Sequence, residues 1–377
     1  MKRQFSKVLV ANRGEIAVRV IRSLREQGIQ SVAVFSEADR DALHVRFANE
    51  AYLIGPAPSS ESYLRGDVIL DVAKRAGADA IHPGYGFLSE NAKFVEACDK
   101  AGVTFIGPGA EPIRLMGDKL AARETARAAG VPIVPGSPGP VATLAEAEKA
   151  AEAIGYPVML KASAGGGGKG MRVVRNKKEL ASAFDLTRGE AGSAFGNDTL
   201  YIEKFIQKPR HIEIQVFADS HGNAVHLGER ECSMQRRHQK IVEEAPSPAV
   251  DATMRQAMGE ASVALVRHVN YTNAGTVEFM ADEDGSFYFL EMNTRLQVEH
   301  PVTELVYGVD LVQEQLRVAQ GETLSWKQEE LVPKGWAMEA RIYAEDPFNH
   351  FLPSLGRIEG VRLGAVPGIR NDMAIFQ

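Results

Sequence analysis

A run of four glycines, Gly165–Gly168, lies a few residues after Lys161 in the stretch KASAGGGGKGM. A backbone without side chains can lie flat against a ligand and present its N–H groups to phosphate oxygens. The stretch lacks the Walker A arrangement, because Gly170 stands where that motif needs Ser or Thr. From the glycines alone, a flexible linker is an equal alternative. The strand-like segments on both sides favour a hairpin tip that folds over phosphates, with Lys161 as a fixed positive charge.

Two glutamates in the segment GTVEFMADEDGSFYFLEMN form a second candidate site. If Asp284 and Gly285 make a two-residue hairpin turn, Glu278 lies directly opposite Glu291, and a four-residue turn keeps both on one face. Like charges in opposed positions destabilise a sheet, so either both point to solvent or a cation lies between them. Asn293 follows on the same face, and carboxylate and amide oxygens suit Mg²⁺. With the glycine loop, this hairpin predicts a Mg–ATP site.

Further polar residues surround this hairpin in the sequence. In TRLQVEHPVTE, an extended backbone would point Arg295, Gln297 and Glu299 the same way. Arg295 suits an oxyanion, and Glu299 suits a general base beside it. Upstream, the run RRHQKIVEEAPSP contains His238 and Lys240. Such a basic run is usually a solvated surface, but within a nucleotide site it is better suited to hold phosphate or a small anion.

Length and composition set the class of protein. A chain of 377 residues exceeds one ordinary hydrophobic core, so two or three domains are expected. The net charge of −6 gives no sign of a nucleic-acid-binding surface. Two cysteines, Cys98 and Cys232, indicate a reducing compartment. Neither a signal peptide nor an apolar run of membrane-spanning length is present. We therefore expect a cytoplasmic protein that binds neither membrane nor nucleic acid.

The elements that must position these residues follow from hydrophobic periodicity. In the first hundred residues, single helices alternate with apolar strands, which predicts a parallel, doubly wound sheet. The strands are expected at 7–11, 31–36, 79–84 and 103–108, and the helices at 14–28, 67–77 and 91–102. The dinucleotide fingerprint G-x-G-x-x-G is absent after the first strand. Residues 112–130 look helical, and a proline-rich break follows.

The rest of the chain predicts a small α/β unit and then antiparallel hairpins. The small unit is expected to contain helices 143–155 and 177–190 and strands 156–162, 171–175 and 199–206. Beyond it, we expect hairpins over 211–235 and 275–293 and helices over 251–270 and 309–320.

With these residues in view, the sequence resembles the biotin carboxylase family, ATP-grasp enzymes that carboxylate biotin in acyl-CoA and pyruvate carboxylases. The matching stretches follow family order over nearly the whole chain. They are ANRGEIAVR (11–19), HPGYGFLSEN (82–91), GPGAEPIRLMGDK (107–119), KASAGGGGKGM (161–171), IEKFI (202–206), RRHQKIVEEAP (236–246), FLEMNTRLQVEHPVTE (289–304) and EARIYAEDP (339–347).

The resemblance implies a multidomain fold of α/β and α+β type. It predicts an N-terminal domain with a doubly wound parallel sheet at 1–115 and an ATP-grasp region at 116–330. Within that region, a mobile lid is expected at about 132–205 and a nucleotide- and metal-binding body at about 206–330. Residues 331–377 would begin a C-terminal domain that in the family continues further, so a chain truncated at its C-terminus is expected.

The resemblance also implies roles for individual residues. ATP contacts are expected at Lys119, Lys161, Gly165, Gly166, Gly167, Gly168, Glu203, Lys204, Ile206, His211, Gln235, His238, Glu278 and Glu291. Metal ligands, for Mg²⁺ or Mn²⁺, are expected at Glu278, Glu291 and Asn293. Bicarbonate is expected at Lys240, Arg295, Gln297 and Val298. Biotin is expected at Arg341 and Tyr85, although packing explains Tyr85 better. The catalytic residues would be Arg295, Glu299, Arg341 and Lys240.

The reaction implied is the phosphorylation of bicarbonate by ATP to carboxyphosphate, followed by carboxylation of biotin. Biotin would arrive on a separate carrier, because no lysine lies between methionines as in a biotin attachment site. A carboxyltransferase and, at full length, a homodimer are the other expected partners, and an acyl-CoA is the expected final acceptor. Two alternatives stay open: another ATP-grasp ligase that activates a carboxylate, and an inactive nucleotide-binding subunit.

Overall fold

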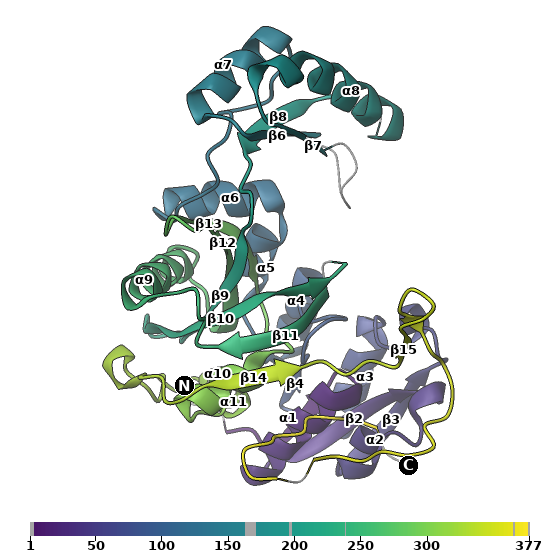
Figure 1. Cartoon of the computed structure of the whole chain (residues 1–377). Coiled ribbons are helices and arrows are strands. Elements are labelled where there is room, and N and C mark those ends of the chain that lie inside the picture. The colour runs from purple at the N-terminus through teal and green to yellow at the C-terminus, as the bar shows by residue number, and fades with distance from the viewer. Residues whose placement is uncertain (1–3, 163–170, 196–197, 238, 365, 376–377) are drawn as a thin grey trace. The chain divides into compact units, whose positions relative to one another are not determined.

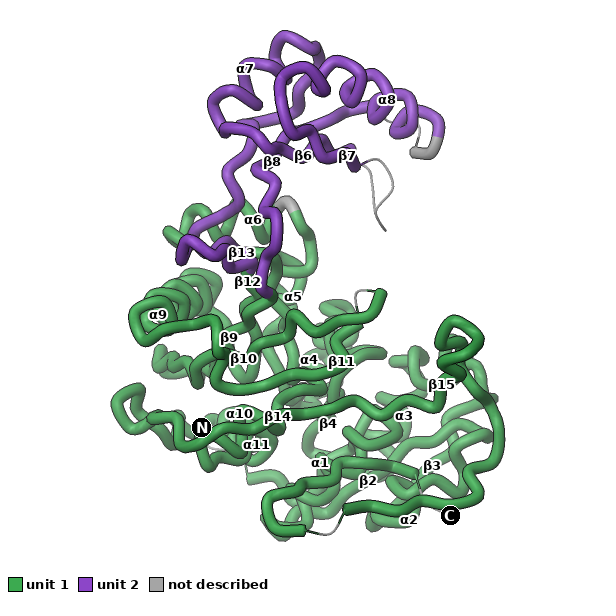
Figure 2. The backbone as a smooth tube through the Cα atoms, viewed as in Figure 1, with its two compact units in different colours: residues 1–131, 211–279, 290–377 green, residues 132–210, 280–289 purple. Residues whose placement is uncertain are grey.

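The protein is described from a computed structural model, which gives residues 4–162, 171–195, 198–237, 239–364 and 366–375. The chain divides into two compact units (Figure 2). The first contains residues 1–131, 211–279 and 290–377, and the second contains residues 132–210 and 280–289. Among the described residues, no helix combines the length and apolarity needed to cross a bilayer.

A five-stranded parallel sheet forms the N-terminal part of the first unit, in the order β3-β2-β1-β4-β5 (Figure 1). The predicted doubly wound sheet is therefore confirmed. Its strands are β1 (Lys7–Val10), β2 (Gln30–Ser36), β3 (Glu50–Gly55), β4 (Ala80–His82) and β5 (Thr104–Phe105). Its helices are α1 (Gly14–Glu26), α2 (Leu43–Phe47), α3 (Gly66–Ala76) and α4 (Ala92–Ala101), with 3₁₀ turns η1 (Glu37–Asp39) and η2 (Ser59–Glu61). The edge strand β3 was not predicted, because most of its side chains are only partly buried.

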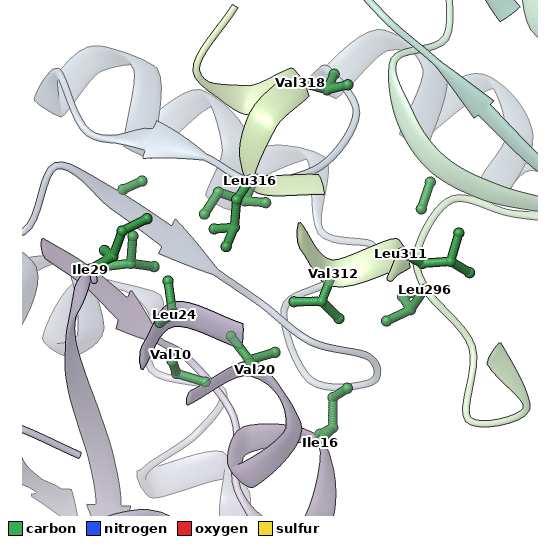
Figure 3. Packing of buried hydrophobic residues seen from close by; sticks show 14 of the residues in the cluster. Val10, Ile16, Val20, Leu24, Ile29, Leu296, Leu311, Val312, Leu316 and Val318 are labelled. Atoms are coloured by element: carbon green, nitrogen blue, oxygen red, sulfur yellow. The ribbon is translucent and has the colours of Figure 1, made fainter. Parts of the chain in front are cut away.

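Side chains of β1 point alternately into two hydrophobic cores, as expected for a parallel sheet covered on both faces. Leu9 belongs to the core that contains α3 and α4. Val8 and Val10 belong to the other core, which α1 joins through Ile16, Val20 and Leu24 (Figure 3). This second core also includes Leu311, Val312 and Leu316 of α11 (Leu311–Ala319) and Phe217 and Leu227 of a second sheet. One continuous core therefore ties the N-terminal sheet to the part of the first unit that carries the candidate site.

The second sheet has six strands in the order β13-β12-β9-β10-β11-β14. They are β9 (Arg210–Ala218), β10 (Ala224–Arg236), β11 (Gln239–Ala245), β12 (Asn273–Ala281), β13 (Phe287–Asn293) and β14 (Ala337–Ala340). The predicted antiparallel hairpin at 211–235 is confirmed by the pairing of β9 with β10. The other helices here are α5 (Ala110–Gly117), α6 (Lys119–Ala128), α9 (Ala252–His268) and α10 (His300–Tyr307), with the 3₁₀ turn η3 (Gln328–Glu330). Beyond β14, the described residues contain only the short pair β15 (Glu345–Asp346) and β16 (Leu352–Pro353).

The turn between β12 and β13 differs from the prediction. The Asp282 N–H donates to the Ser286 C=O at 2.8 Å, and the Gly285 N–H donates to the Asp282 C=O at 3.2 Å. The loop is therefore Glu283–Gly285, three residues rather than two, and Gly285 has a φ of +85° that favours glycine. A second irregularity follows in β13, where Leu290 and Glu291 are both exposed between buried neighbours. The simple two-residue-turn register was wrong.

The second unit is a three-stranded antiparallel sheet, ordered β7-β6-β8, with two helices. Its elements are β6 (Val158–Ala162), β7 (Met171–Val174), β8 (Leu200–Lys204), α7 (Leu144–Ile154) and α8 (Lys177–Phe195). Helix α7 begins with a capping box, in which Thr143 and Glu146 satisfy each other's backbone N–H groups. The helices and strands predicted for this segment are confirmed, and α8 runs five residues further than expected.

The core around α1 allows a stability test. Leu24→Ala removes a fully buried side chain and should lower the free energy of unfolding by about 2–5 kcal/mol. Leu53→Ala deletes the same atoms from a side chain that is 44% exposed and should cost less than half as much. Urea unfolding of both variants measures the difference, and equal losses would contradict this assignment of the core.

Candidate active site

The centre of the candidate site is the ammonium group of Lys240, which lies among three buried carboxylates. Its Nζ donates to Glu299 Oε1 at 2.7 Å and to Glu278 Oε1 at 3.0 Å, and it also pairs with Glu213. Burial by itself lowers the pKa of Lys240, but the charges of Glu213 and Glu299 outweigh it and raise that pKa. Lys240 is therefore a fixed cation.

The alternation of β9 supplies two members of this group. His211 and Glu213 lie on one face of the strand, and the apolar side chains of Ile212 and Ile214 lie on the other. Both faces are buried, so the polar face points into the protein and not to solvent. His211 Nε2 lies 2.7 Å from Glu278 Oε2. Burial opposes ionisation of Glu278, yet His211 and Lys240 lower its pKa to about 2.

Beneath Lys240, Arg230 forms a fully buried scaffold. Its guanidinium donates to Glu213 Oε1 at 2.6 Å and to Gln297 Oε1 at 2.7 Å. Its other bonds go to Gln215, Thr276 and Thr303. All the N–H directions of the fork are thus used, which fixes the side chains around it. Burial opposes the charge on Glu213, but Lys240 and Arg230 lower its pKa to about 2.

The expected metal ligands are Glu278, Glu291 and Asn293. Asn293 Nδ2 donates to Glu278 Oε1 at 2.8 Å, so this carboxylate and amide do lie together. Within the described part of the chain, no hydrogen bond reaches the Glu291 carboxylate. Burial and then the charge of Glu278 raise the pKa of Glu291. The Glu291 carboxylate is exposed and close enough to Glu278 for the two charges to interact, which suits a magnesium ion; the Asn293 oxygen accepts a hydrogen bond from Arg295 in this structure.

Residues 294–299 do not form the predicted extended segment. The chain bends after Thr294, and Glu299 is already the N-cap of α10, whose first turn contains Pro301. Proline at the first helical positions favours a helix start, which explains the difference. Gln297 and Glu299 still reach the Lys240 group, because Gln297 Nε2 donates to Glu278 at 2.9 Å.

Arg295 and Arg341 each bind a different carboxylate near Lys240. Arg295 Nη2 donates to Asn293 Oδ1 at 2.9 Å, and its Nε donates to Glu90 at 3.0 Å. Arg341 Nη2 donates to Glu299 Oε2 at 2.9 Å. Glu299 is therefore held by a cation at each oxygen, Lys240 at one and Arg341 at the other.

Comparisons with known proteins show the family of this chain. Residues 4–113 match the protein family described as "Biotin carboxylase, N-terminal domain". Residues 118–327 match the family described as "Carbamoyl-phosphate synthase L chain, ATP binding domain". The chain is 56% identical to a biotin carboxylase of a Nostoc species over 99% of its own length and 83% of that protein. The chain belongs to the biotin carboxylase family. It is an ATP-grasp ligase of that family.

Two further relatives of the family are informative. The propionyl-CoA carboxylase alpha chain of Ruegeria pomeroyi is 56% identical, over 95% of this chain and 53% of that protein. The structure of the biotin carboxylase domain dimer of Hydrogenobacter thermophilus 2-oxoglutarate carboxylase, in complex with MgADP, ADP and bicarbonate, is 52% identical with a TM-score of 0.85. It covers 98% of this chain and 81% of that one.

Separate contacts place the other predicted site residues of the first unit. Gln235 Nε2 lies 3.2 Å from His211 Nδ1. Lys119 lies at the start of α6, and its charge acts to lower the pKa of Glu291, although the larger effect of burial raises that pKa overall. Val298 is half-buried in the turn before α10. Tyr85 packs against the core that contains α1, as the packing interpretation predicts.

The predicted residues of the second unit form their own group. Lys161 Nζ donates to Glu203 Oε2, joining β6 to β8. Lys204 Nζ donates instead to the C=O of Gly155 at 2.9 Å, and Ile206 is buried. The glycines Gly165, Gly166, Gly167 and Gly168 and His238 lie outside the described residues.

Several residues of the site were missed by sequence reasoning. They are Glu90, which pairs with Arg295; Glu213, which pairs with Lys240; Arg230, which pairs with Glu213; and Glu243, which pairs with Arg341. The segment HIEIQ carried a signal for Glu213, because its polar residues alternate with apolar ones. That pattern is typical of a strand with a solvated face, and only the assembled sheet shows that this face is buried.

Removal of the central cation should be costly. Lys240→Met leaves Glu213, Glu278 and Glu299 without their common partner, and we expect a loss of about 3–5 kcal/mol in the free energy of unfolding. Lys177→Met removes an exposed lysine that pairs with Glu152 and should change stability by less than about 1 kcal/mol. Chemical denaturation compares the two, and an equally small effect at Lys240 would contradict the assignment.

Proposed function

We propose that this chain carboxylates biotin on a carrier, using ATP and bicarbonate through carboxyphosphate. The observation that carries the proposal is the Glu299 carboxylate, held between Lys240 and Arg341. A general base needs a fixed position, and the contacts of Lys240 and Arg341 with its two oxygens hold this carboxylate in place. The same cations suit a small anion such as bicarbonate, which we assign to Lys240, Arg295, Gln297 and Val298.

In the first step, Glu299 accepts the proton of bicarbonate, and the freed oxygen attacks the γ-phosphorus of ATP. The bond from that phosphorus to the bridging oxygen breaks, which gives ADP and carboxyphosphate. Positioning and compensation of charge account for most of the catalysis in phosphoryl transfer. Lys240 and Arg295 supply positive charge to the carboxyl end. We assign ATP contacts to His211, Gln235 and Lys119 in the first unit.

In the second step, carboxyphosphate breaks down to CO₂ and phosphate. The phosphate then takes the proton from the ureido nitrogen of biotin, and that nitrogen forms the new bond to CO₂. Negative charge develops on the ureido oxygen, and we assign Arg341 to balance it. Its guanidinium stays charged, because burial by itself lowers the pKa of Arg341 but the charges of Glu299 and Glu243 together outweigh it and raise that pKa.

For the metal, Glu278, Glu291 and Asn293 would hold Mg²⁺ or Mn²⁺, which compensates the charge of the nucleotide phosphates when bound. The relative from Hydrogenobacter thermophilus, solved with MgADP and bicarbonate, supports this choice. In the second unit, we assign nucleotide contacts to Lys161, Glu203, Lys204 and Ile206 and to the glycines of 165–168.

A carrier protein, a carboxyltransferase and a second copy of the chain are the partners we propose. The family relatives serve different acceptors, including propionyl-CoA and 2-oxoglutarate. We propose an acyl-CoA as the final acceptor. A cytoplasmic location is supported by Cys98 and Cys232, which are both buried and unpaired.

Turnover of ATP tests the proposed function. We expect ATP hydrolysis to be stimulated by bicarbonate and further by free biotin, because biotin consumes the intermediate. The readout is phosphate release with each substrate omitted in turn. Stimulation by bicarbonate that ignores biotin would favour another ATP-grasp ligase, and tight ATP binding without turnover would favour an inactive subunit.

Substitution of the base tests its role. Glu299→Gln keeps the size of the side chain but cannot take a proton, so bicarbonate-dependent turnover should fall about 10²–10⁴-fold. The affinity for ATP, measured by calorimetry, should stay within a few-fold of the original. Glu244→Gln, on the same sheet but away from Lys240, is the matched control. Full activity of Glu299→Gln would remove Glu299 from the mechanism.

A further inference from the structure

Two glutamates lie directly opposite each other where β11 pairs with the edge strand β14. Glu243 is the register partner of Glu339. The ladder continues to Arg341, whose N–H donates to the Ile241 C=O at 3.0 Å. Glu339 and Arg341 are two residues apart and so share a face of the strand. Like charges at opposed positions destabilise a sheet, so this pair needs a compensating charge or a proton.

The available cation does not satisfy both acids. Arg341 Nε donates to Glu243 Oε1 at 2.6 Å, and the same guanidinium also serves Glu299. Glu243 is fully buried, and its second oxygen, Oε2, has no hydrogen-bond partner among the described residues. The Oε2 atom of Glu339 is also buried and unpartnered there. A buried carboxylate oxygen without a donor is costly, and a proton on one of two adjacent acids supplies that donor.

The other charged groups around the pair are mostly acidic. The charges of Arg341, Glu299 and Glu213 act on Glu243. The charges that act on Glu339 are those of Glu243, Glu299, Arg341 and Glu15 of α1. Burial, and then the charges of Glu243 and Glu299, raise the pKa of Glu339 to about 8. Burial also raises the pKa of Glu243, although Arg341 opposes this. At neutral pH a proton is therefore retained in this cluster.

We propose that Glu243 and Glu339 hold one proton between them and act together as positioning residues for Arg341. The inference rests on the proposed function of Arg341 toward biotin. With one proton present, the pair carries a single negative charge, and Arg341 is shared between Glu243 and Glu299. Loss of the proton doubles the charge of the pair and draws the guanidinium toward it, away from Glu299 and from the substrate oxygen.

Thermal unfolding of the whole chain without substrates tests the shared proton. The folded-state pKa of Glu339 lies above its unfolded value, so unfolding releases a proton at intermediate pH and wild-type stability falls as pH rises to about 8. Glu339→Gln cannot lose a proton. We expect its Tm, relative to wild type, to rise from pH 5 to pH 8 and to level off above pH 8.

The control is Glu244→Gln, which removes the same charge from the neighbouring position of β11. Glu244 pairs with Met338 of β14 and with Glu231 of β10, and it accepts a hydrogen bond from Trp336. It therefore lies outside the Glu243–Glu339 pair. Its Tm difference from wild type should not change over the same pH range. If the Tm difference between Glu339→Gln and wild type is also independent of pH, the proposal of a shared proton is overturned.

The positioning role is read from kcat/KM for free biotin between pH 7 and pH 9. At pH 9, about nine tenths of an acid with a pKa of about 8 has lost its proton, so wild-type kcat/KM should fall about tenfold relative to Glu339→Gln. If the Tm difference changes with pH but the ratio of wild-type to Glu339→Gln kcat/KM does not, the positioning role is overturned. If biotin does not stimulate turnover in the wild type, the proposed function fails, and the positioning role fails with it. The Tm result for the shared proton does not depend on turnover and would still stand.

Discussion

The structure of this site depends on buried carboxylates that outnumber the cations beside them. Lys240 contacts Glu213, Glu278 and Glu299 at once, and Arg230 completes the charge balance from below. Each carboxylate would be unstable without these partners, since an unpaired buried charge costs several kcal/mol. The cations keep Glu213 and Glu278 ionised in a buried environment, where charges interact more strongly than in water.

The same constraint is met in three different ways within one sheet. At Lys240 the compensating charge belongs to the protein itself. At Glu278 and Glu291, no cation among the residues that the structure describes forms an ion pair with the Glu291 carboxylate, which leaves it suited to a metal ion. Where Glu243 opposes Glu339, the Arg341 guanidinium bonds Glu243 and Glu299, and we propose that a shared proton completes the charge balance.

Much of this could be predicted from the sequence where local pattern decides the structure. The parallel sheet around β1 and the capped helix α7 follow from periodicity and end signals, and the Glu278, Asn293 and Lys240 group follows from motifs. Register and environment could not be predicted. The loop Glu283–Gly285 has one residue more than the simplest hairpin turn. The chain bends between Thr294 and the start of α10 at His300, where an extended backbone was considered. Glu339 and Glu243 lie nearly a hundred residues apart, so only the β11–β14 pairing shows that they oppose each other.

The central claim is that the charges of Glu278 on β12 and Glu291 on β13 are compensated by a nucleotide-bound metal. Crystals grown with ADP and Mn²⁺ test it directly, because the anomalous signal of manganese locates the ion independently of the protein density. We predict a peak coordinated by oxygen atoms of both glutamates and of the nucleotide, at about the 2.0–2.2 Å expected for a hard divalent cation. A structure with bound ADP in which manganese contacts neither glutamate would contradict the account.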